Sequence, residues 1–450
     1  MIYRVFLSPI VGIILITCVL GLMNNPVCAQ YLRIEYPALS KENTMKLAVS
    51  YALWIPEGVK TIRGIVVHQH GAGTIAAKTS EDGVHDLHWQ ALAKKWDCAF
   101  LVPTYHVLSN ETGVANGGAM LWFDPRRGSE KTFLTALKEF AAKSGHPELD
   151  RIPWVLWGHS GGAIWSDVMT MLHPDRVAAL WLRSGAASMG TNWTEFPEVS
   201  IPAAAYAVPT VCNSGIQEKA GIGASQMQKF IDYRKRNAPI AFISDPLTGH
   251  WTGNSRYLAI PFLDAVMKLR LAGPGDINQT LKPIVMEKSW LAPVNGGDVI
   301  LNSSFKGDPV SAIWLPSQTV GKLWDEFIKT GGVSDTTPPP APFDLKIKDL
   351  GDKGTEITWS AEADLESGIH HFIIMKDGQE LANLPSVNLV RFAVRPMFQA
   401  GWTNSYNDAP ANPVPEMRFV DFWPKDNVNH IYSVITVNTV GLKSAPAHSR

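Results

Sequence analysis

The feature that most constrains the fold of this chain is an alternation of short apolar runs with amphipathic segments between residues 30 and about 272. The apolar runs have the length of strands, and the segments between them space their hydrophobic residues as helices do. Alternating strands and helices favour a mainly parallel sheet covered on both faces, because each helix carries the chain back across the sheet. The predicted fold class is therefore α/β.

The expected elements have definite bounds. The strands are Leu32–Tyr36, Leu47–Ile55, Gly64–Gln69, Ala99–Thr104, Pro153–Trp157, Val177–Leu182, Thr210–Asn213 and Pro239–Ser244. The helices are Asp86–Trp96, Glu130–Lys143, Gly162–Leu172, Ser225–Arg236 and Leu258–Leu271. No helix separates the first two strands, so we expect them to pair antiparallel, because a parallel pair needs a long crossover.

The composition excludes several classes of protein. The chain of 450 residues carries 40 Lys and Arg against 41 Asp and Glu, for a net charge of −1. This balance provides no basic footprint for nucleic acid. Hydrophobic residues make up 46% and charged residues 18%, which does not describe a disordered chain. The length suggests roughly two or three domains, each with its own core.

Residues 1–29 have the organisation of a cleaved secretory signal. Arg4 precedes an apolar run from Val11 to Met23, and Val27-Cys28-Ala29 provides small residues at positions −3 and −1 of a cut after Ala29. The alternative is a membrane anchor, but the apolar run is short for a span. We therefore expect a secreted or periplasmic protein without a transmembrane anchor.

The rest of the chain divides into three segments. Residues 30–333 form one expected domain, and its less regular part from about 273 is an extension packed on the rest. Residues 334–342 include four prolines, which make a stiff linker. Residues 343–450 contain short β-rich runs, and Asp377-Gly378 is a hairpin signal.

The segment 343–450 resembles a fibronectin type III domain. The resemblance rests on the proline-rich entry, on Trp359 in the second strand, and on the alternating run Tyr432–Asn438 followed by Gly441. It implies a small β-sandwich, although the stretch 384–418 is longer than the family has there. The expected role is a spacer or stabiliser, and the alternative is contact with a polysaccharide.

The strongest chemical signal is Gly158-His-Ser-Gly-Gly162, which lies between an expected strand and an expected helix. A nucleophilic serine must project from a tight strand-to-helix turn, where only small neighbours fit. The N-terminus of the following helix favours the negative charge that develops during attack. This context predicts that Ser160 is a nucleophile.

An activated serine needs a base and an orienting acid. Where the serine lies on such a strand-to-helix turn, the acid follows it along the chain and the histidine follows the acid. His250 comes just after the last expected strand, where a loop carries an imidazole over the sheet edge. Glu218 follows the penultimate strand and a glycine turn, so we favour it as the acid. Asp245, five residues before His250, is the alternative.

An oxyanion hole needs two backbone N–H groups. Gly161 follows the nucleophile, and Ala72 lies in the glycine-rich loop after the third expected strand, so these are the expected donors. The alternative use of that region is a metal site built from His68, His70, His85, Asp86 and His88. Their spacing fits no ligand pattern, and the serine machinery needs no metal, so we expect neither metal nor cofactor.

Together these elements resemble the α/β-hydrolase family over residues 30 to about 272, with the triad and the oxyanion donors named above in the family's positions and order. The resemblance implies an eight-stranded, mostly parallel sheet with helices on both faces. Members of this family are mostly esterases, lipases and peptidases. Several secreted bacterial members carry accessory β-domains such as fibronectin type III.

The expected function is hydrolysis of a carboxylic ester through an acyl-enzyme, on a small-molecule or polymer-linked substrate. Only a short stretch separates Leu182 from the penultimate strand, which leaves no room for a large lid and favours an open cleft. Two alternatives remain at this point. One is a serine peptidase of the same fold, and the other is a non-catalytic glycan-binding protein that uses the fold as a scaffold.

The 16 tryptophans are the compositional outlier. Most of them lie on expected strands and helices and are interpreted as core packing. Trp251 adjoins His250, and Trp122 lies in a glycine-rich insertion after the fourth strand. We expect these two to line the cleft as flat apolar walls against a sugar or aromatic ring.

Overall fold

The structure is a computed structural model. It describes residues 29–39, 45–72, 80, 83–106, 122–188, 199–218, 220–276, 279–384, 417–422 and 428–449. The predicted secretory signal therefore lies, except for its last residue, outside the described residues. Within the described part of the chain, every helix is too short or too polar to cross a membrane.

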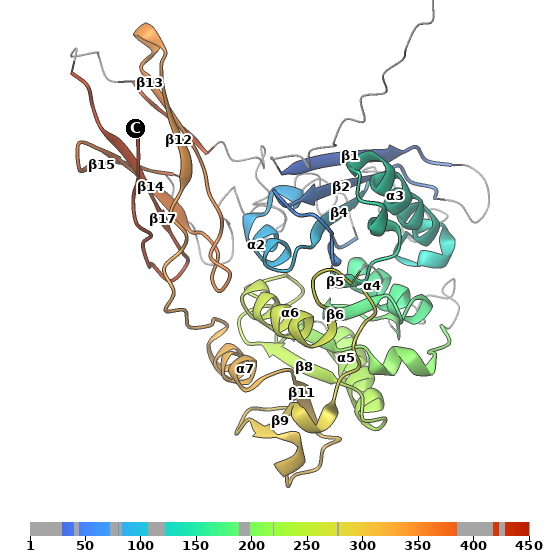
Figure 1. Cartoon of the computed structure of the whole chain (residues 1–450). Coiled ribbons are helices and arrows are strands. Elements are labelled where there is room, and N and C mark those ends of the chain that lie inside the picture. The colour runs from blue at the N-terminus through green and yellow to red at the C-terminus, as the bar shows by residue number, and fades with distance from the viewer. Residues whose placement is uncertain are drawn as a thin grey trace, which may run out of the picture.

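A sheet of eight strands forms the centre of the molecule (Figure 1). Its strands are β1 (Gln30–Tyr36), β2 (Val49–Ile55), β3 (Ile65–Gln69), β4 (Ala99–Tyr105), β5 (Trp154–His159), β6 (Val177–Arg183), β7 (Thr210–Gly215) and β8 (Ile240–Asp245). They lie in the order β1-β2-β4-β3-β5-β6-β7-β8. Both β1 and β4 pair antiparallel with β2, and all other pairs are parallel. This is the α/β-hydrolase fold, and it confirms the expected antiparallel start.

Helices cover both faces of this sheet. They are α2 (Leu87–Lys95), α3 (Ser129–Ser144), α4 (Gly161–Leu172), α5 (Ala220–Arg234) and α6 (Arg256–Arg270). On one face α2 contacts α6. On the other, Trp165 of α4 donates a hydrogen bond to Ser129 of α3, and Asp167 of α4 pairs with Lys229 of α5 at 2.9 Å. Short 3₁₀ turns lie at Gly83–His85, Pro125–Arg127, Pro147–Asp150, Ala203–Ala207, Met286–Lys288, Asn302–Ser304 and Gly351–Lys353.

Tryptophan side chains fill much of the core. Those that are fully buried are Trp89, Trp122, Trp154, Trp157, Trp165, Trp181, Trp314 and Trp324. Phe133 of α3 meets Trp154 and Trp165 edge-on, with ring centroids 5.1 Å and 5.3 Å apart. Such pairs are worth about 0.5–1.5 kcal/mol each beyond the apolar area that they bury. Most of the tryptophan excess is therefore packing, as the sequence indicated.

The segment after residue 272 packs on the hydrolase sheet. It contains β9 (Trp290–Pro293), β10 (Ile300–Leu301), β11 (Ala312–Leu315) and α7 (Gln318–Thr330), with the strands in the order β10-β9-β11. Trp314 and Trp324 enter the same apolar core as the central sheet. The three strands were not expected, because runs of two to four residues carry no readable period.

The C-terminal part consists of two antiparallel sheets. One holds β12 (Phe343–Asp349), β13 (Thr355–Ser360) and β16 (Arg418–Asp421), and the other holds β14 (His371–Lys376), β15 (Gln379–Leu384), β17 (Tyr432–Val437) and β18 (Ala447–His448). The predicted hairpin joins β14 to β15, and Asp377 and Gly378 have the positive φ that a tight two-residue turn requires. Residues 385–416 of the unusually long stretch lie outside the described residues.

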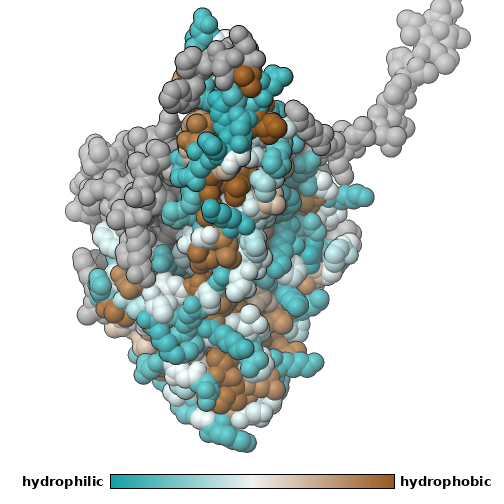
Figure 2. Space-filling view, turned by 90° about the vertical axis from the view of Figure 1, so that its left-hand side faces the viewer, coloured by the Kyte–Doolittle hydropathy of each residue, from teal (hydrophilic) through white to brown (hydrophobic). Residues whose placement is uncertain are grey.

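The C-terminal sheets lie against α2 (Figure 1). Leu87 of α2 belongs to the apolar cluster that also contains Trp359 and Phe372. His88 Nε2 lies 2.9 Å from the carbonyl oxygen of Leu365, and Lys94 pairs with Glu362. Figure 2 views the molecule from this side, where apolar surface residues are interspersed with hydrophilic ones. The two parts of the chain therefore share a packed boundary as well as a linker.

Replacing Leu87 by Asp is expected to weaken the C-terminal part, because it puts a charge into a shared apolar cluster. We expect the free energy of unfolding of that part to fall by about 3 kcal/mol. The control is Leu269→Asp, since Leu269 is 39% exposed on α6 and should change stability little. Scanning calorimetry measures both, and identical melting profiles for the two variants would contradict the shared boundary.

Candidate active site

Ser160 lies at the turn between β5 and α4 in a strained backbone conformation, with φ 53° and ψ −118°. Its N–H donates to the carbonyl oxygen of Arg183 at 2.8 Å. A Cβ on Gly158 would lie 2.2 Å from the oxygen of Gly162, and one on Gly162 would lie 2.3 Å from the oxygen of His70. These backbone approaches exclude every residue but glycine at both positions, as the motif predicts.

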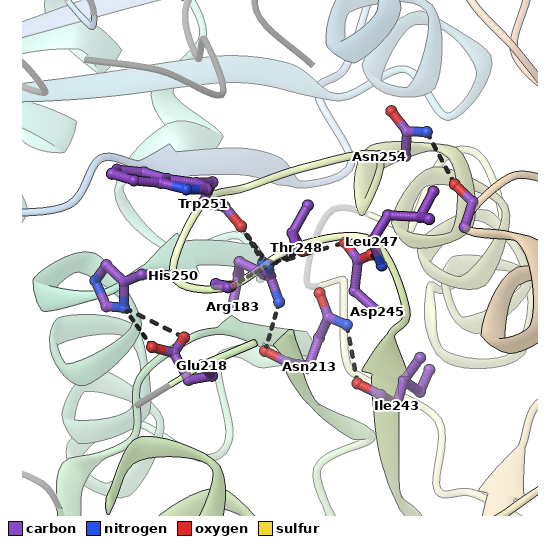
Figure 3. Close-up of polar contacts among 12 residues, drawn as sticks. Arg183, Asn213, Glu218, Ile243, Asp245, Leu247, Thr248, His250, Trp251 and Asn254 are labelled. Atoms are coloured by element: carbon purple, nitrogen blue, oxygen red, sulfur yellow. Dashed lines mark hydrogen bonds and ion pairs between the residues drawn. The ribbon is translucent and has the colours of Figure 1, made fainter. Parts of the chain in front are cut away.

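Three side chains from three loops meet at this turn. His250 Nε2 lies 2.9 Å from Ser160 Oγ, and His250 Nδ1 lies 3.1 Å and 3.2 Å from the two carboxylate oxygens of Glu218. Figure 3 shows the imidazole facing that carboxylate. The Glu218 side chain is 2% exposed and the His250 side chain 29% exposed. A buried carboxylate thus holds the far nitrogen of an imidazole whose near nitrogen faces the serine.

Asp245, the alternative acid, ends β8 and serves other partners. Its Oδ1 accepts the N–H of Leu247 at 3.0 Å, and its Oδ2 lies 3.8 Å from Nη2 of Arg183. Both side chains of this ion pair are buried. The carboxylate within hydrogen-bond distance of His250 is therefore that of Glu218.

The predicted oxyanion donors lie next to each other. A Cβ on Gly161 would lie 3.2 Å from the backbone nitrogen of Ala72, so the two backbones approach closely. The loop that carries Ala72 is anchored by His70. Tyr105 N–H donates to His70 Nε2 at 3.0 Å, so the ring proton is on Nδ1, which lies 2.6 Å from the oxygen of Gly71. Burial lowers the pKa of His70 to about 4 and keeps the ring neutral.

The side chains of the alternative metal cluster serve separate packing and hydrogen-bond roles. His68 stacks on Trp157 with ring centroids 4.3 Å apart, and His85 stacks on Tyr31. Asp86 caps α2 and pairs with Arg256 at 2.8 Å. These contacts fit structural roles better than metal ligation.

Among the described residues, one group of acidic side chains has the spacing to hold a metal ion, and it lies in the C-terminal part. Its members are Asp335, Asp364 and Glu366. Burial raises the pKa of Asp364 to about 6. Asn438 donates to both aspartates, and Ser367 donates to Asp335, so hydrogen bonds already serve these oxygens. We assign no ion to this group.

The two tryptophans expected in the cleft differ in exposure. Trp251 is 41% exposed beside His250, and Ile216, which precedes the acid loop, is 64% exposed. Trp122 is 1% exposed and stacks on Tyr105 with ring centroids 4.2 Å apart. Its burial favours packing behind the oxyanion loop over contact with a substrate, whereas an exposed Trp251 suits a cleft wall.

The sequence reasoning overlooked Arg183. Its sequence could have pointed to it, because Arg183 is the one charged residue in the otherwise apolar strand Val177–Arg183. Every residue of this strand is buried. Burial lowers the pKa of Arg183, and the nearby carboxylates of Asp245 and Glu218 oppose that shift. A buried guanidinium must be hydrogen-bonded, and Arg183 binds carbonyl groups of the loop that carries His250.

No family model and no curated protein matches this sequence. A ferulic acid esterase is 13% identical over 53% of this chain and 99% of its own, with a TM-score of 0.37. An S-formylglutathione hydrolase from Agrobacterium tumefaciens is 12% identical over 54% of this chain and 95% of its own, with a TM-score of 0.36. The central fibronectin-III array of RIM-binding protein is 17% identical over 24% of this chain and 31% of its own, with a TM-score of 0.16. These values carry no argument about function, which rests on the geometry above.

The buried, neutral His70 predicts a loss of stability in acid. Unfolded histidine takes up a proton near pH 6.5, whereas folded His70 does so at about 4, so the unfolded state binds more protons between these values. The free energy of unfolding should therefore fall by about 3 kcal/mol on this account as the pH drops from 6.5 to 4.

His70→Gln keeps one donor and one acceptor but cannot be protonated. Urea unfolding across this pH range should give a shallower loss of stability for the variant than for the wild type. Equal pH slopes for the two proteins would show that His70 does not carry the effect.

Proposed function

We propose that this protein is a serine hydrolase that cleaves carboxylic esters, with Ser160 as nucleophile, His250 as general base and Glu218 as the orienting acid. The observation that carries the proposal is the continuous chain of short contacts from Ser160 Oγ through both ring nitrogens of His250 to the Glu218 carboxylate. Each distance is within hydrogen-bond range, and the three groups follow the order that this fold uses.

The reaction has two steps. His250 Nε2 takes the proton of Ser160 as Oγ attacks the ester carbonyl, and the N–H groups of Gly161 and Ala72 hold the oxyanion. The protonated imidazole then gives its proton to the leaving alcohol, while the Glu218 carboxylate stabilises its positive charge. Water, activated by the same imidazole, hydrolyses the acyl-enzyme and regenerates the serine.

The surroundings of the triad support an ester with an apolar or ring-shaped part, including one linked to a carbohydrate or a polymer. Ile216 and Trp251 expose apolar surface on the loops that carry the acid and the base. Flat apolar side chains beside a reacting group suit aromatic and sugar rings. His250 is itself partly exposed, so a bulky substrate needs no deep tunnel to reach it.

We further propose that residues 1–29 direct the protein out of the cytoplasm and that residues 343–450 are a fibronectin type III-like domain. The two antiparallel sheets support the second proposal, since Trp359 on one sheet meets Phe372 on the other edge-on at 5.3 Å. The basic start, apolar run and small-residue ending support the first.

Replacing Ser160 by Ala tests the proposed activity directly. The variant lacks the nucleophile, so kcat for p-nitrophenyl acetate should fall by more than about 10⁴-fold. Ser166→Ala is the matched control, because Ser166 is a buried serine of α4, the helix that follows Ser160, and lies outside the triad. Full activity in Ser160→Ala would refute the assignment, provided that both variants fold.

The choice of acid is tested by exchanging each carboxylate for its amide. Glu218→Gln should lower kcat by roughly 10³–10⁴-fold, because the imidazolium loses its charged partner. Asp245→Asn should lower thermal stability, because buried Arg183 loses its nearest counter-charge, but should leave kcat within about tenfold of the wild type. A larger loss of kcat in Asp245→Asn than in Glu218→Gln would make Asp245 the acid.

A further inference from the structure

Arg183 is the last residue of β6, and its fully buried side chain forms hydrogen bonds to the loop after β8. Its Nε donates to the carbonyl oxygen of Trp251 at 2.8 Å. Its Nη2 donates to the carbonyl oxygen of Gly249 at 2.9 Å and to the hydroxyl of Thr248 at 2.8 Å. Figure 3 shows the guanidinium enclosed by this loop. Two of the carbonyls that it binds belong to Gly249 and Trp251, the residues immediately before and after His250. Its Nη1 also donates to the carbonyl oxygen of Asn213 at 3.5 Å.

His159 forms a further hydrogen bond to the same loop. It pairs with Arg183 in the register of β5 and β6, and its Nε2 lies 2.6 Å from the carbonyl oxygen of His250 itself. A ring nitrogen next to a carbonyl must carry a proton, so Nε2–H donates. Two neighbouring strand ends thus hold three successive carbonyls, those of Gly249, His250 and Trp251.

The same arginine also contacts the nucleophile through its backbone. The carbonyl oxygen of Arg183 accepts the N–H of Ser160 at 2.8 Å. One residue therefore fixes the backbone of the serine with its main chain and the backbone around the base with its side chain. Gln217 N–H also donates to the carbonyl oxygen of Thr248 at 3.1 Å, which ties the acid loop to the same segment.

We propose that Arg183 is a positioning residue for the base of the proposed reaction. It holds the backbone of His250 so that the imidazole stays within reach of Ser160. The inference rests on the proposed function, since it assigns Arg183 a role in that chemistry and not only in stability.

Physical reasoning favours an arginine in this role. The guanidinium is planar, permanently charged and able to donate in several fixed directions at once, so it binds two carbonyls and a hydroxyl together. Lysine presents a single charged point on a flexible stem and cannot span the same acceptors. A displacement of about 1 Å at a reacting group is enough to cost about 10²-fold in rate.

The test compares Arg183→Met and Arg183→Lys with Arg234→Met in the full-length chain. Arg234 is a matched control, because it is also buried and also donates to backbone carbonyls, those of Ala238 and Pro309. A fluorophosphonate counts competent sites at its labelling end point. The kcat and KM for p-nitrophenyl acetate are then expressed per titrated site, which removes any loss of folded protein.

We expect Arg183→Met to lower kcat per titrated site by about 10²-fold, with KM within about threefold of the wild type. Arg183→Lys should recover part of the rate, since it keeps the charge and some donors. Arg234→Met should melt at a lower temperature and keep the wild-type kcat per titrated site. If Arg183→Met does not fold, a reduced kcat in Arg183→Lys supports the inference and a wild-type kcat contradicts it.

Two kinds of failure are distinguishable. A folded Arg183→Met that melts early but keeps kcat per titrated site, as Arg234→Met does, overturns the positioning role and leaves the proposed function intact. A wild-type chain that reacts with neither ester nor fluorophosphonate contradicts the proposed function, and the role of Arg183 with it.

Discussion

Close backbone packing around Ser160 is the constraint on which the rest of the site depends. A Cβ on Gly185 would lie 2.4 Å from the carbonyl oxygen of Ser160, and Gly158 and Gly162 are equally confined. A serine with φ 53° costs about 1–3 kcal/mol, so its surroundings must hold it there. The parallel strands β5 and β6 do so, because the neighbouring strand end receives the serine N–H. Every other group of the site is placed relative to this turn.

The charges of the site are arranged so that few of them need to change. Arg183 at the end of β6 and Asp245 at the end of β8 form a buried pair across β7, and the Glu218 side chain is almost as buried. Burial lowers the pKa of both His70 and His159, so these rings act as neutral hydrogen-bond partners. In the proposed reaction, His250 is the group that gains and loses a proton. Fixed dipoles and charges around one moving proton are the arrangement that makes electrostatic stabilisation effective.

Much of the framework was predictable from sequence because its signals are local. The alternation of strands and helices predicted the sheet and its covering helices. The glycines around Ser160 predicted the turn, and the order of the later loops pointed to His250 and Glu218. Each of these inferences depends on residues within one element or on the chain order that the fold imposes.

The remaining features depend on contacts between distant segments, which no local pattern encodes. The hydrogen bonds from Arg183 to the loop that carries His250 join residues that are 65 to 68 positions apart. In the sequence Leu87 is an ordinary apolar helix residue, and its contact with the C-terminal sheets is evident only in the structure. Trp122 was expected in the cleft on the strength of its glycine-rich neighbourhood, yet it is buried against Tyr105. Burial and long-range partners decide all three cases.

In the proposed reaction, the contact chain through Ser160, His250 and Glu218 makes this one serine nucleophilic. Mass spectrometry of peptides from protein treated with a fluorophosphonate identifies the serine that reacts. We expect a single phosphonylated residue, Ser160, with labelling slowed strongly in His250→Ala. An unlabelled Ser160 in folded wild-type protein, or a label on a different serine, would contradict it.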